Sequence, residues 1–248
     1  MEAVGVIPAR YGSTRFPGKP LADLLGKPLV QHVWERTHQS CRLSRVIVAT
    51  DDDRIFEAVQ TFGGEVVMTS PEHPSGTDRV AEVVKDMDVD VVVNIQGDEP
   101  LIEGRVIDEL VSAFEADGDL KMATLANRTQ AGKDQNDPHT TKVVVDQKGF
   151  ALYFSRSPVP FSRDELSSEK RADRLQHIGI YGFRKDFLLL FTSLEPTPLE
   201  QIEGLEQLRA LEHGFRVKVI ETDHHPTNVD TLGDLERVKR IIREHGVQ

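Results

Sequence analysis

Short apolar runs alternate with helix-period segments along the first half of the chain. The runs are Val4–Ile7, Val46–Ala49, Val66–Met68 and Val91–Ile95, and the segments between them are Pro28–Gln39, Asp52–Phe62 and Gly76–Lys85. Strands that are apolar on both faces and alternate with helices predict a parallel sheet of βαβ units. Ligands of such sheets bind at the carboxyl ends of the strands. Three stretches are therefore the first candidates for a site: Pro8 onward, Thr50–Asp53 and Gln96–Pro100.

The second half of the chain is less regular. Its apolar runs predict further strands, some of them antiparallel, at Lys121–Ala126, Lys142–Val145, Ala151–Phe154, Ile178–Phe183 and Arg216–Ile220. Helices are predicted at Leu199–His213, with Gly214 as C-cap, and at Leu232–Glu244. The polar stretch Ser162–Arg174 is expected to be an exposed loop. No repeat or linker divides the chain, so residues 1–248 are expected to form a single domain.

The composition is that of an ordered globular protein. Of the 248 residues, 38% are hydrophobic and 29% are charged, which argues against disorder. No apolar run approaches the roughly 20 residues that span a bilayer, and Met1 leads directly into a strand-like run instead of a signal peptide. The single cysteine, Cys41, excludes an intramolecular disulfide and a cysteine-based zinc site. We therefore expect a cytoplasmic protein.

The net charge of −11 disfavours nucleic acid as a partner, because phosphate backbones require a basic surface. A phosphorylated small molecule remains possible where positive charge is concentrated locally. The loop after the first strand is such a place, with Arg10, Arg15 and Lys19 beside two glycines. Glycine lets backbone N–H groups approach a phosphate, and the cations supply charge. This predicts a phosphate-binding loop. The alternative is a solvated basic loop.

The phosphate-loop candidate differs from a Walker A loop in two respects. Five residues separate Gly12 from Gly18 where that motif has four, and Pro20 stands where it has the Ser or Thr that holds magnesium.

Two acidic residues are candidate metal ligands. Asp98 follows the run Val91–Ile95, where its carboxylate would meet a hard cation at the edge of the sheet. It could instead form a turn or cap a helix. Asp230 precedes the last helix and is either its N-cap or a second carboxylate for the same metal. The sequence leaves both alternatives open.

Other polar residues are weaker candidates. Pro74–Arg79 places small polar groups and backbone donors at a helix N-terminus, a natural anion or base-edge site. Arg156 follows a strand, and several polar residues interrupt apolar elements; taken alone, each is by default structural: His177, Tyr181, Glu206 and Gln207. His224 and His225 are adjacent and form a poor metal pair. No Ser–His–Asp or Cys–His arrangement is discernible.

Taken together, the motifs resemble those of the CMP-Kdo synthetases, cytidylyltransferases that activate 3-deoxy-D-manno-octulosonic acid (Kdo) for lipopolysaccharide assembly. The loop at residues 7–21 is shared by a wider nucleotidyltransferase superfamily, whereas YFSRSPVP, HIGIYGF and LEQLRALE are more specific to the Kdo branch. The motifs run in order through almost the whole chain, at residues 7–21, 48–55, 63–79, 94–100, 142–160, 177–183, 199–214 and 229–231.

The resemblance implies an α/β fold, with a mixed, mostly parallel sheet flanked by helices as in nucleotide-diphospho-sugar transferases. A smaller lobe near residues 140–185 would form the contact of a homodimer. The implied reaction transfers CMP from CTP to the anomeric hydroxyl of Kdo and releases pyrophosphate, with Mg²⁺ as cofactor. Alternatives are a related acid sugar, such as 8-amino-Kdo or sialic acid, and a non-catalytic CTP-binding regulator.

The resemblance also implies residue roles. Arg10, Lys19 and Asp98 would be catalytic, and Arg15 would be a weaker triphosphate contact. CTP would be bound by Pro8, Ala9, Arg10, Lys19, Ser75, Gly76 and Arg79. The sugar acid would be surrounded by Gln96, Arg156, His177, Tyr181, Glu206 and Gln207. Asp98 and Asp230 would ligate the magnesium ion. For the in-line transfer, the protein needs mainly to position the reactants and to stabilise the charge that develops electrostatically.

Overall fold

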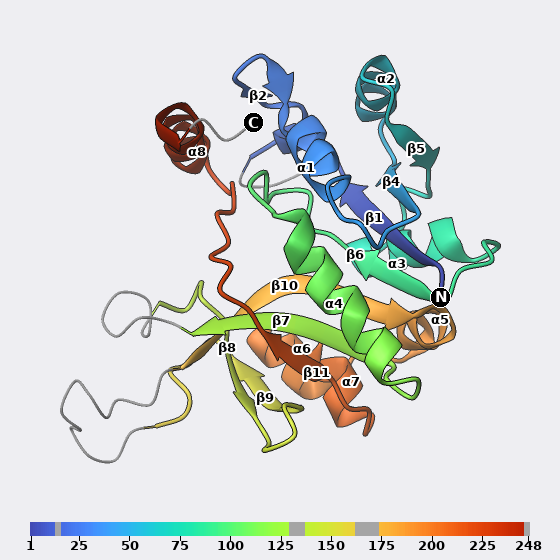
Figure 1. Ribbon diagram of the computed structural model, residues 1–248, viewed down its shortest axis with the longest axis vertical. Coiled ribbons are helices and arrows are strands. Elements are labelled where there is room, and N and C mark those ends of the chain that lie inside the picture. The colour runs from blue at the N-terminus through green and yellow to red at the C-terminus, as the bar shows by residue number, and fades with distance from the viewer. Residues whose placement is uncertain (13–15, 129–136, 162–173, 246–248) are drawn as a thin grey trace. The chain divides into compact units, whose positions relative to one another are not determined.

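A computed structural model describes residues 1–12, 16–128, 137–161 and 174–245 (Figure 1). The chain divides into two compact units, residues 1–111 with 226–248 and residues 112–225. Arg15 lies outside the described residues, as does the predicted loop Ser162–Arg174 apart from Arg174. No described helix is long and apolar enough to cross a membrane.

The first unit contains the predicted parallel sheet. Its strands are β1 (Ala3–Ala9), β4 (Arg45–Thr50), β5 (Glu65–Met68) and β6 (Val91–Asn94), paired in the order β6-β1-β4-β5. Every residue of β6 is buried, which explains the three consecutive valines with which it begins. The predicted helices are confirmed as α1 (Leu29–Thr37), α2 (Asp53–Thr61) and α3 (Gly76–Val84). The βαβ alternation was therefore a sound guide to this unit.

Two smaller elements follow β1. A 3-10 helix, η1 (Lys19–Leu21), begins at the end of the basic loop, and β2 (Asp23–Leu24) pairs with β3 (Lys27–Pro28) in a short hairpin. Helix α4 (Gly104–Ala116), absent from the predicted elements, begins a few residues after β6. Its apolar side chains recur at helical spacing and are buried: Val106, Ile107, Leu110, Val111 and Phe114.

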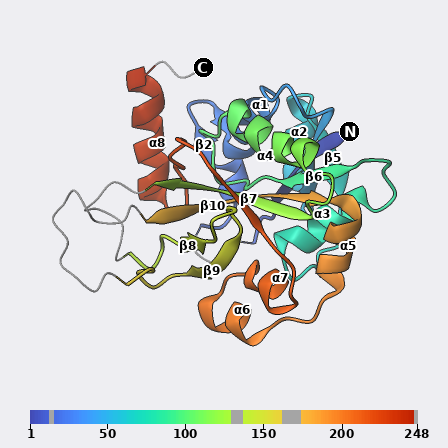
Figure 2. The same ribbon diagram turned by 60° about the horizontal axis from the view of Figure 1, so that its bottom comes forward.

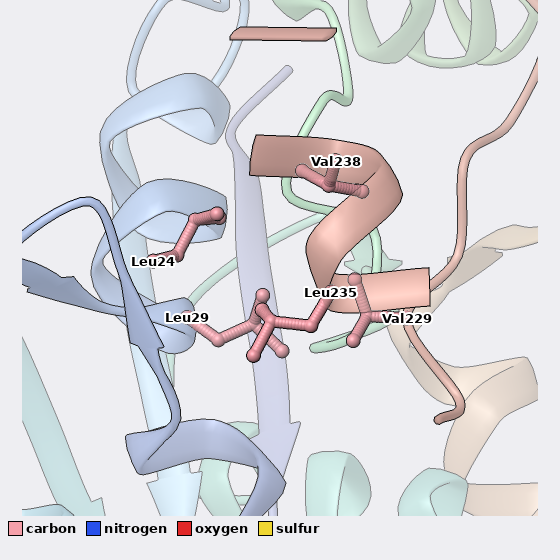
Figure 3. Close-up of a cluster of buried hydrophobic side chains, with 5 residues drawn as sticks. All are labelled: Leu24, Leu29, Val229, Leu235 and Val238. Atoms are coloured by element: carbon pink, nitrogen blue, oxygen red, sulfur yellow. The ribbon is translucent and has the colours of Figure 1, made fainter. Parts of the chain in front are cut away.

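The last helix, α8 (Leu232–His245), returns to the first unit. Figure 3 shows the buried cluster that holds α8 there. Leu24 of β2 and Leu29 of α1 lie beside Val229, which precedes α8, and beside Leu235 and Val238 of α8 itself. Thr231 caps α8, because its hydroxyl accepts from the N–H of Asp234 at 3.2 Å and its own N–H donates to the Asp234 carboxylate at 3.0 Å. The N-cap interpretation of Asp230 is therefore wrong.

The second unit is built on a mixed sheet (Figure 2). Strand β7 (Met122–Arg128) pairs in parallel with β11 (Lys218–Glu221) and antiparallel with β10 (Leu175–Arg184). β8 (Lys142–Val145) pairs antiparallel with β10 and with β9 (Ala151–Ser155). All five predicted strands are confirmed, with antiparallel pairs among them. The two units together give the predicted α/β class with its mixed sheet.

The helices of the second unit differ from those predicted. The single helix expected at Leu199–His213 is two helices, α6 (Pro198–Glu203) and α7 (Leu208–Glu212). They separate at Gly204, whose left-handed φ of 62° ends α6 because only glycine adopts this conformation without strain. Helix α5 (Lys185–Ser193) is a further addition. The predicted lobe at residues 140–185 falls within this unit, and its role in dimerisation stays a prediction.

Candidate active site

A cleft of about 310 Å³ opens in the first unit, where β1 and β6 end. It is lined by all ten described residues of this unit that were predicted to bind nucleotide, sugar acid or metal: Pro8, Ala9, Arg10, Lys19, Ser75, Gly76, Arg79, Gln96, Asp98 and Asp230. Pro20, His73, Pro74 and Gly97 complete the lining. The carboxyl-end rule for parallel sheets therefore selected the edge at which this cleft opens.

The basic loop reaches the cleft through Lys19. The preceding residue, Gly18, has a φ of 71°, and its N–H donates to the carbonyl of Tyr11 at 3.0 Å. A Cβ on Gly18 would come within 3.0 Å of the Tyr11 ring, so the close approach also requires glycine. Lys19 then starts η1, in which the N–H of Ala22 donates to the Lys19 carbonyl at 3.0 Å. This turn fixes the backbone from which the lysine side chain enters the cleft.

Lys19 joins the two predicted metal ligands. Its Nζ lies 2.8 Å from Oδ2 of Asp98 and 3.2 Å from Oδ1 of Asp230. The backbone N–H of Val229 donates to the carbonyl of Asp98 at 2.9 Å. The structure thus brings together three charged groups that are far apart in the sequence. Asp98 also lies in a turn, in which the N–H of Glu99 donates to the carbonyl of Gln96 at 3.4 Å, so it forms a turn as well as this contact.

The two carboxylates suit a hard cation that is shared with phosphate. Within the described part of the chain no group of three or more His, Cys, Asp or Glu residues could hold a metal by itself. Magnesium bound to phosphates, however, takes only one or two protein carboxylates. The Oδ1 atom of Asp98 is buried, and no described residue donates a hydrogen bond to it, so this carboxylate has acceptor capacity to spare.

The lining of the cleft also includes a buried arginine. Arg79 is 3% exposed; its guanidinium donates to Oδ2 of Asp51 at 2.7 Å and to the hydroxyl of Thr69. Asp51 and Thr69 follow β4 and β5, so the same rule of strand ends that selected Thr50–Asp53 would have found both. The two residues were nevertheless missing from the predicted site. They hold the guanidinium in one orientation at the cleft.

Helix α3 begins at the cleft. Ser75 is its N-cap and accepts from the N–H of Asp78 at 3.2 Å. The next residue is Gly76, where a Cβ would lie 3.2 Å from the Pro8 ring. In the loop after β6, a Cβ on Gly97 would lie 3.0 Å from the Pro8 carbonyl oxygen. Both glycines therefore let neighbouring loops close tightly around Pro8, which lines the cleft.

His73 lines the cleft but was not predicted. Its Nε2 contacts the carboxylate of Glu82, which also accepts from the N–H of Ser70 at 3.0 Å. The contact lowers the pKa of Glu82. The histidine occurs in a loop with no apolar periodicity, and nothing in the sequence pattern distinguishes it from a surface residue.

The other predicted sugar-acid residues lie in the second unit, on β10 and beside α6 and α7. The rings of His177 and Tyr181 are 5.4 Å apart, and Phe154 meets the His177 ring edge-on at 5.1 Å. Although His177 retains some surface exposure, its enclosure lowers the pKa of the imidazole to about 3. Burial and the nearby Glu206 raise the pKa of Tyr181. Both side chains are therefore neutral at physiological pH.

Two of the remaining three candidates of the second unit, Arg156 and Gln207, differ in their contacts. Arg156 donates to three carbonyls, those of Glu203 at 2.7 Å, Pro138 at 3.1 Å and Gly204 at 3.3 Å. Gln207 is 4% exposed, and its amide nitrogen has no hydrogen-bond partner among the described residues. A buried amide donor of this kind is costly unless a ligand satisfies it.

Comparison with known proteins identifies the family. Residues 4–221 match the cytidylyltransferase family. The 3-deoxy-manno-octulosonate cytidylyltransferase of Geobacter metallireducens is 52% identical over 96% of this chain and 96% of that protein. The protein of the same description from Geotalea uraniireducens is 53% identical over 98% of this chain and 100% of its own length.

Solved structures agree. A CMP:2-keto-3-deoxy-manno-octonic acid synthetase complexed with CTP is 44% identical, with a TM-score of 0.93, and the match covers 99% of this chain and 100% of that one. A 4-diphosphocytidyl-2C-methyl-D-erythritol synthase from Anaerococcus prevotii, at 11% identity and a TM-score of 0.63, shares the fold over 98% of both chains. The chain belongs to the cytidylyltransferase family and, within it, to the 3-deoxy-manno-octulosonate cytidylyltransferases.

Proposed function

We propose that this enzyme transfers CMP from CTP to the anomeric hydroxyl of Kdo, releasing pyrophosphate and supplying CMP-Kdo for lipopolysaccharide biosynthesis. The observation that carries the proposal is the meeting of Lys19, Asp98 and Asp230 in one cleft, which Arg79 and the N-terminus of α3 also line. Relatives with this description are about half identical to the chain over nearly its full length.

The nucleotide would lie along the cleft. Arg10 and Lys19 would carry the charge of the triphosphate, because an ammonium and a guanidinium at the end of β1 are the cations that its oxygens require. Pro8, Ala9, Ser75 and Gly76 would form the walls around cytidine, and Arg79, already oriented by Asp51, would offer its remaining donors to the nucleotide. The contacts of Arg79 with Asp51 and Thr69 hold its guanidinium in place, which limits the entropy lost on binding.

Asp98 and Asp230 would hold a magnesium ion. When bound there, the ion supplies Lewis-acid polarisation of the phosphate and makes the sugar hydroxyl easier to deprotonate. The chain itself positions the two carboxylates. The Val229–Asp98 hydrogen bond and the capping of α8 by Thr231 set the spacing between them. Arg10 and Lys19 then offset charge that develops on the α-phosphate and on the leaving pyrophosphate.

The candidates for recognition of the sugar acid are Gln96 in the first unit and five residues of the second unit: Arg156, His177, Tyr181, Glu206 and Gln207. The depressed pKa of His177 means that it would act as a neutral hydrogen-bonding group and not as a cation for the sugar carboxylate. The unsatisfied amide of Gln207 would donate to a hydroxyl or a carboxylate.

The enzyme would act as a cytoplasmic homodimer, with its contact in the lobe at residues 140–185. Two large apolar side chains of that lobe are exposed, Leu152 at 63% and Phe161 at 86%. Side chains of this kind commonly mark a protein–protein contact when they occur close together.

A substrate panel tests the proposal. Pyrophosphate release would be measured with CTP, UTP and ATP against Kdo, 8-amino-Kdo and sialic acid. We expect release with CTP and Kdo. Release with another acid only would replace Kdo as acceptor, and tight CTP binding with no pyrophosphate from any acceptor would identify a regulator.

A further inference from the structure

The ammonium group of Lys19 lies between two carboxylates and serves both as a shared cation. Its distances to Oδ2 of Asp98 and Oδ1 of Asp230 are 2.8 and 3.2 Å. The Lys19 and Asp98 side chains are only 16% and 22% exposed, so water screens this pair poorly. The chain therefore provides its own counter-ion at the point where the two acids meet.

The backbone around this cluster is fixed, whereas the lysine side chain is not. Gly18 and the hydrogen bonds of η1 set the Lys19 backbone, and the Val229–Asp98 hydrogen bond sets both acids. Lysine, by contrast, carries its charge on a flexible four-carbon stem. A change of partner at this site therefore needs only rotation of the Lys19 side chain.

The oxygens that Lys19 contacts belong to the carboxylates assigned above to magnesium. Magnesium binds oxygen at about 2.1 Å and tolerates little distortion. Two cations also repel each other at such short range. A metal that takes the oxygens now bonded to Lys19 must displace the ammonium. A triphosphate offers the displaced ammonium several anionic oxygens in the same cleft.

We propose that Lys19 is an internal counter-ion, which neutralises Asp98 and Asp230 in the nucleotide-free enzyme and moves to the triphosphate when CTP binds. Divalent metal then binds weakly to the free enzyme and tightly to its CTP complex. This inference rests on the proposed function, because it takes Asp98 and Asp230 as the metal ligands. Reciprocity requires that metal strengthen CTP binding by the same factor.

Direct metal binding tests the proposal without turnover. Mn²⁺ would be titrated into the nucleotide-free protein and followed by electron paramagnetic resonance, for wild type, Lys19→Met and Lys27→Met. The Lys27 ammonium pairs with Glu35 at 2.7 Å outside the cleft, so Lys27→Met is the matched control. We expect Lys19→Met to bind Mn²⁺ about tenfold more tightly or better, since removing a nearby charge shifts such equilibria by one or more logarithmic units. Lys27→Met should bind as wild type does.

Two outcomes separate this inference from the metal assignment. Equal Mn²⁺ affinity in wild type and Lys19→Met, with weaker binding after Asp98→Asn is added to Lys19→Met, would overturn the counter-ion role and retain the metal site. If the double variant binds as tightly as Lys19→Met, Asp98 is not a ligand and both assignments fail. Circular dichroism would check folding, and Lys19→Gln would replace Lys19→Met if the latter does not fold.

Discussion

The backbone N–H of Val229 donates to the carbonyl oxygen of Asp98 at 2.9 Å, which links the loop after β6 to the segment before α8. Val229 is fully buried in the cluster that holds α8, and the next residue is Asp230. The hydrophobic packing of the C-terminal helix therefore determines where the second carboxylate lies.

This link predicts different effects for two valines of the same cluster. Val229→Ala and Val238→Ala each remove two buried methyl groups and should each lower the free energy of unfolding by about 2 kcal/mol. Only Val229→Ala should also lower turnover clearly, because only Val229 adjoins a carboxylate of the site. Urea denaturation and pyrophosphate release measure the two effects. Equal turnover in the two variants would mean that the packing does not position Asp230.

The charged groups of the cleft should dominate turnover. Asp98→Asn or Lys19→Ala is expected to reduce kcat on the order of a hundredfold or more, as for other lost electrostatic groups in active sites. Asp88→Asn, a change of the same kind at an exposed position, serves as the control and should leave kcat unchanged. Turnover close to that of wild type in Asp98→Asn or Lys19→Ala would remove that residue from the catalytic set.

The ion pair between Asp51 and Arg79 should matter for both stability and nucleotide binding. Asp51→Asn leaves a nearly buried guanidinium without its carboxylate and should cost about 2 kcal/mol of stability, less than a fully buried pair because Asp51 is 18% exposed. The KM for CTP should rise as well, since Arg79 lines the cleft.

Asp52→Asn is the matched control for this pair. It breaks the ion pair with the exposed Arg54 but keeps a residue that caps α2 equally well, so the loss should stay below about 1 kcal/mol. An unchanged KM in Asp51→Asn would show that the orientation of Arg79 is not needed for CTP.

His177 should make stability depend on pH. The folded state keeps the imidazole neutral to a pKa of about 3, whereas the unfolded chain protonates near 6.5. The unfolded state therefore binds more protons below pH 6.5, and stability falls as the pH drops from there toward 3. Between pH 7.5 and 5, wild type should lose about 2 kcal/mol more than His177→Gln, which cannot titrate. Parallel losses in urea denaturation would contradict the neutral assignment.

Much of the fold could be predicted because buried strands and helix faces require apolar residues at regular positions in the sequence. β6 is apolar at Val91, Val92 and Val93 because both its faces are covered. The apolar run of α5 at Phe187–Phe191 carries no such periodicity, and a short run of this kind does not distinguish helix from strand. The break between α6 and α7 at Gly204 depends on a left-handed backbone conformation, which the periodicity of apolar residues does not reveal.

The candidate site could be predicted only in part, namely for residues that follow strands. Residues that follow strands, such as Asp98, could be placed at the correct edge by the topology of parallel sheets. The contact of Lys19 with Asp230 spans 211 positions and depends on how α8 packs, so no local pattern contains it. The residues that hold Arg79 were missed although they too follow strands. Nothing in the residue type of Asp51 or Thr69 distinguishes a side chain that positions another side chain from an ordinary polar residue.

The central claim is the transfer of CMP from CTP to Kdo, and phosphorus NMR of the complete reaction tests it most directly. With CTP, Kdo and magnesium, we predict equal amounts of pyrophosphate and of a new phosphodiester signal, and neither signal when Kdo is omitted. Inorganic phosphate in place of pyrophosphate, or pyrophosphate without a phosphodiester, would contradict the proposed transfer.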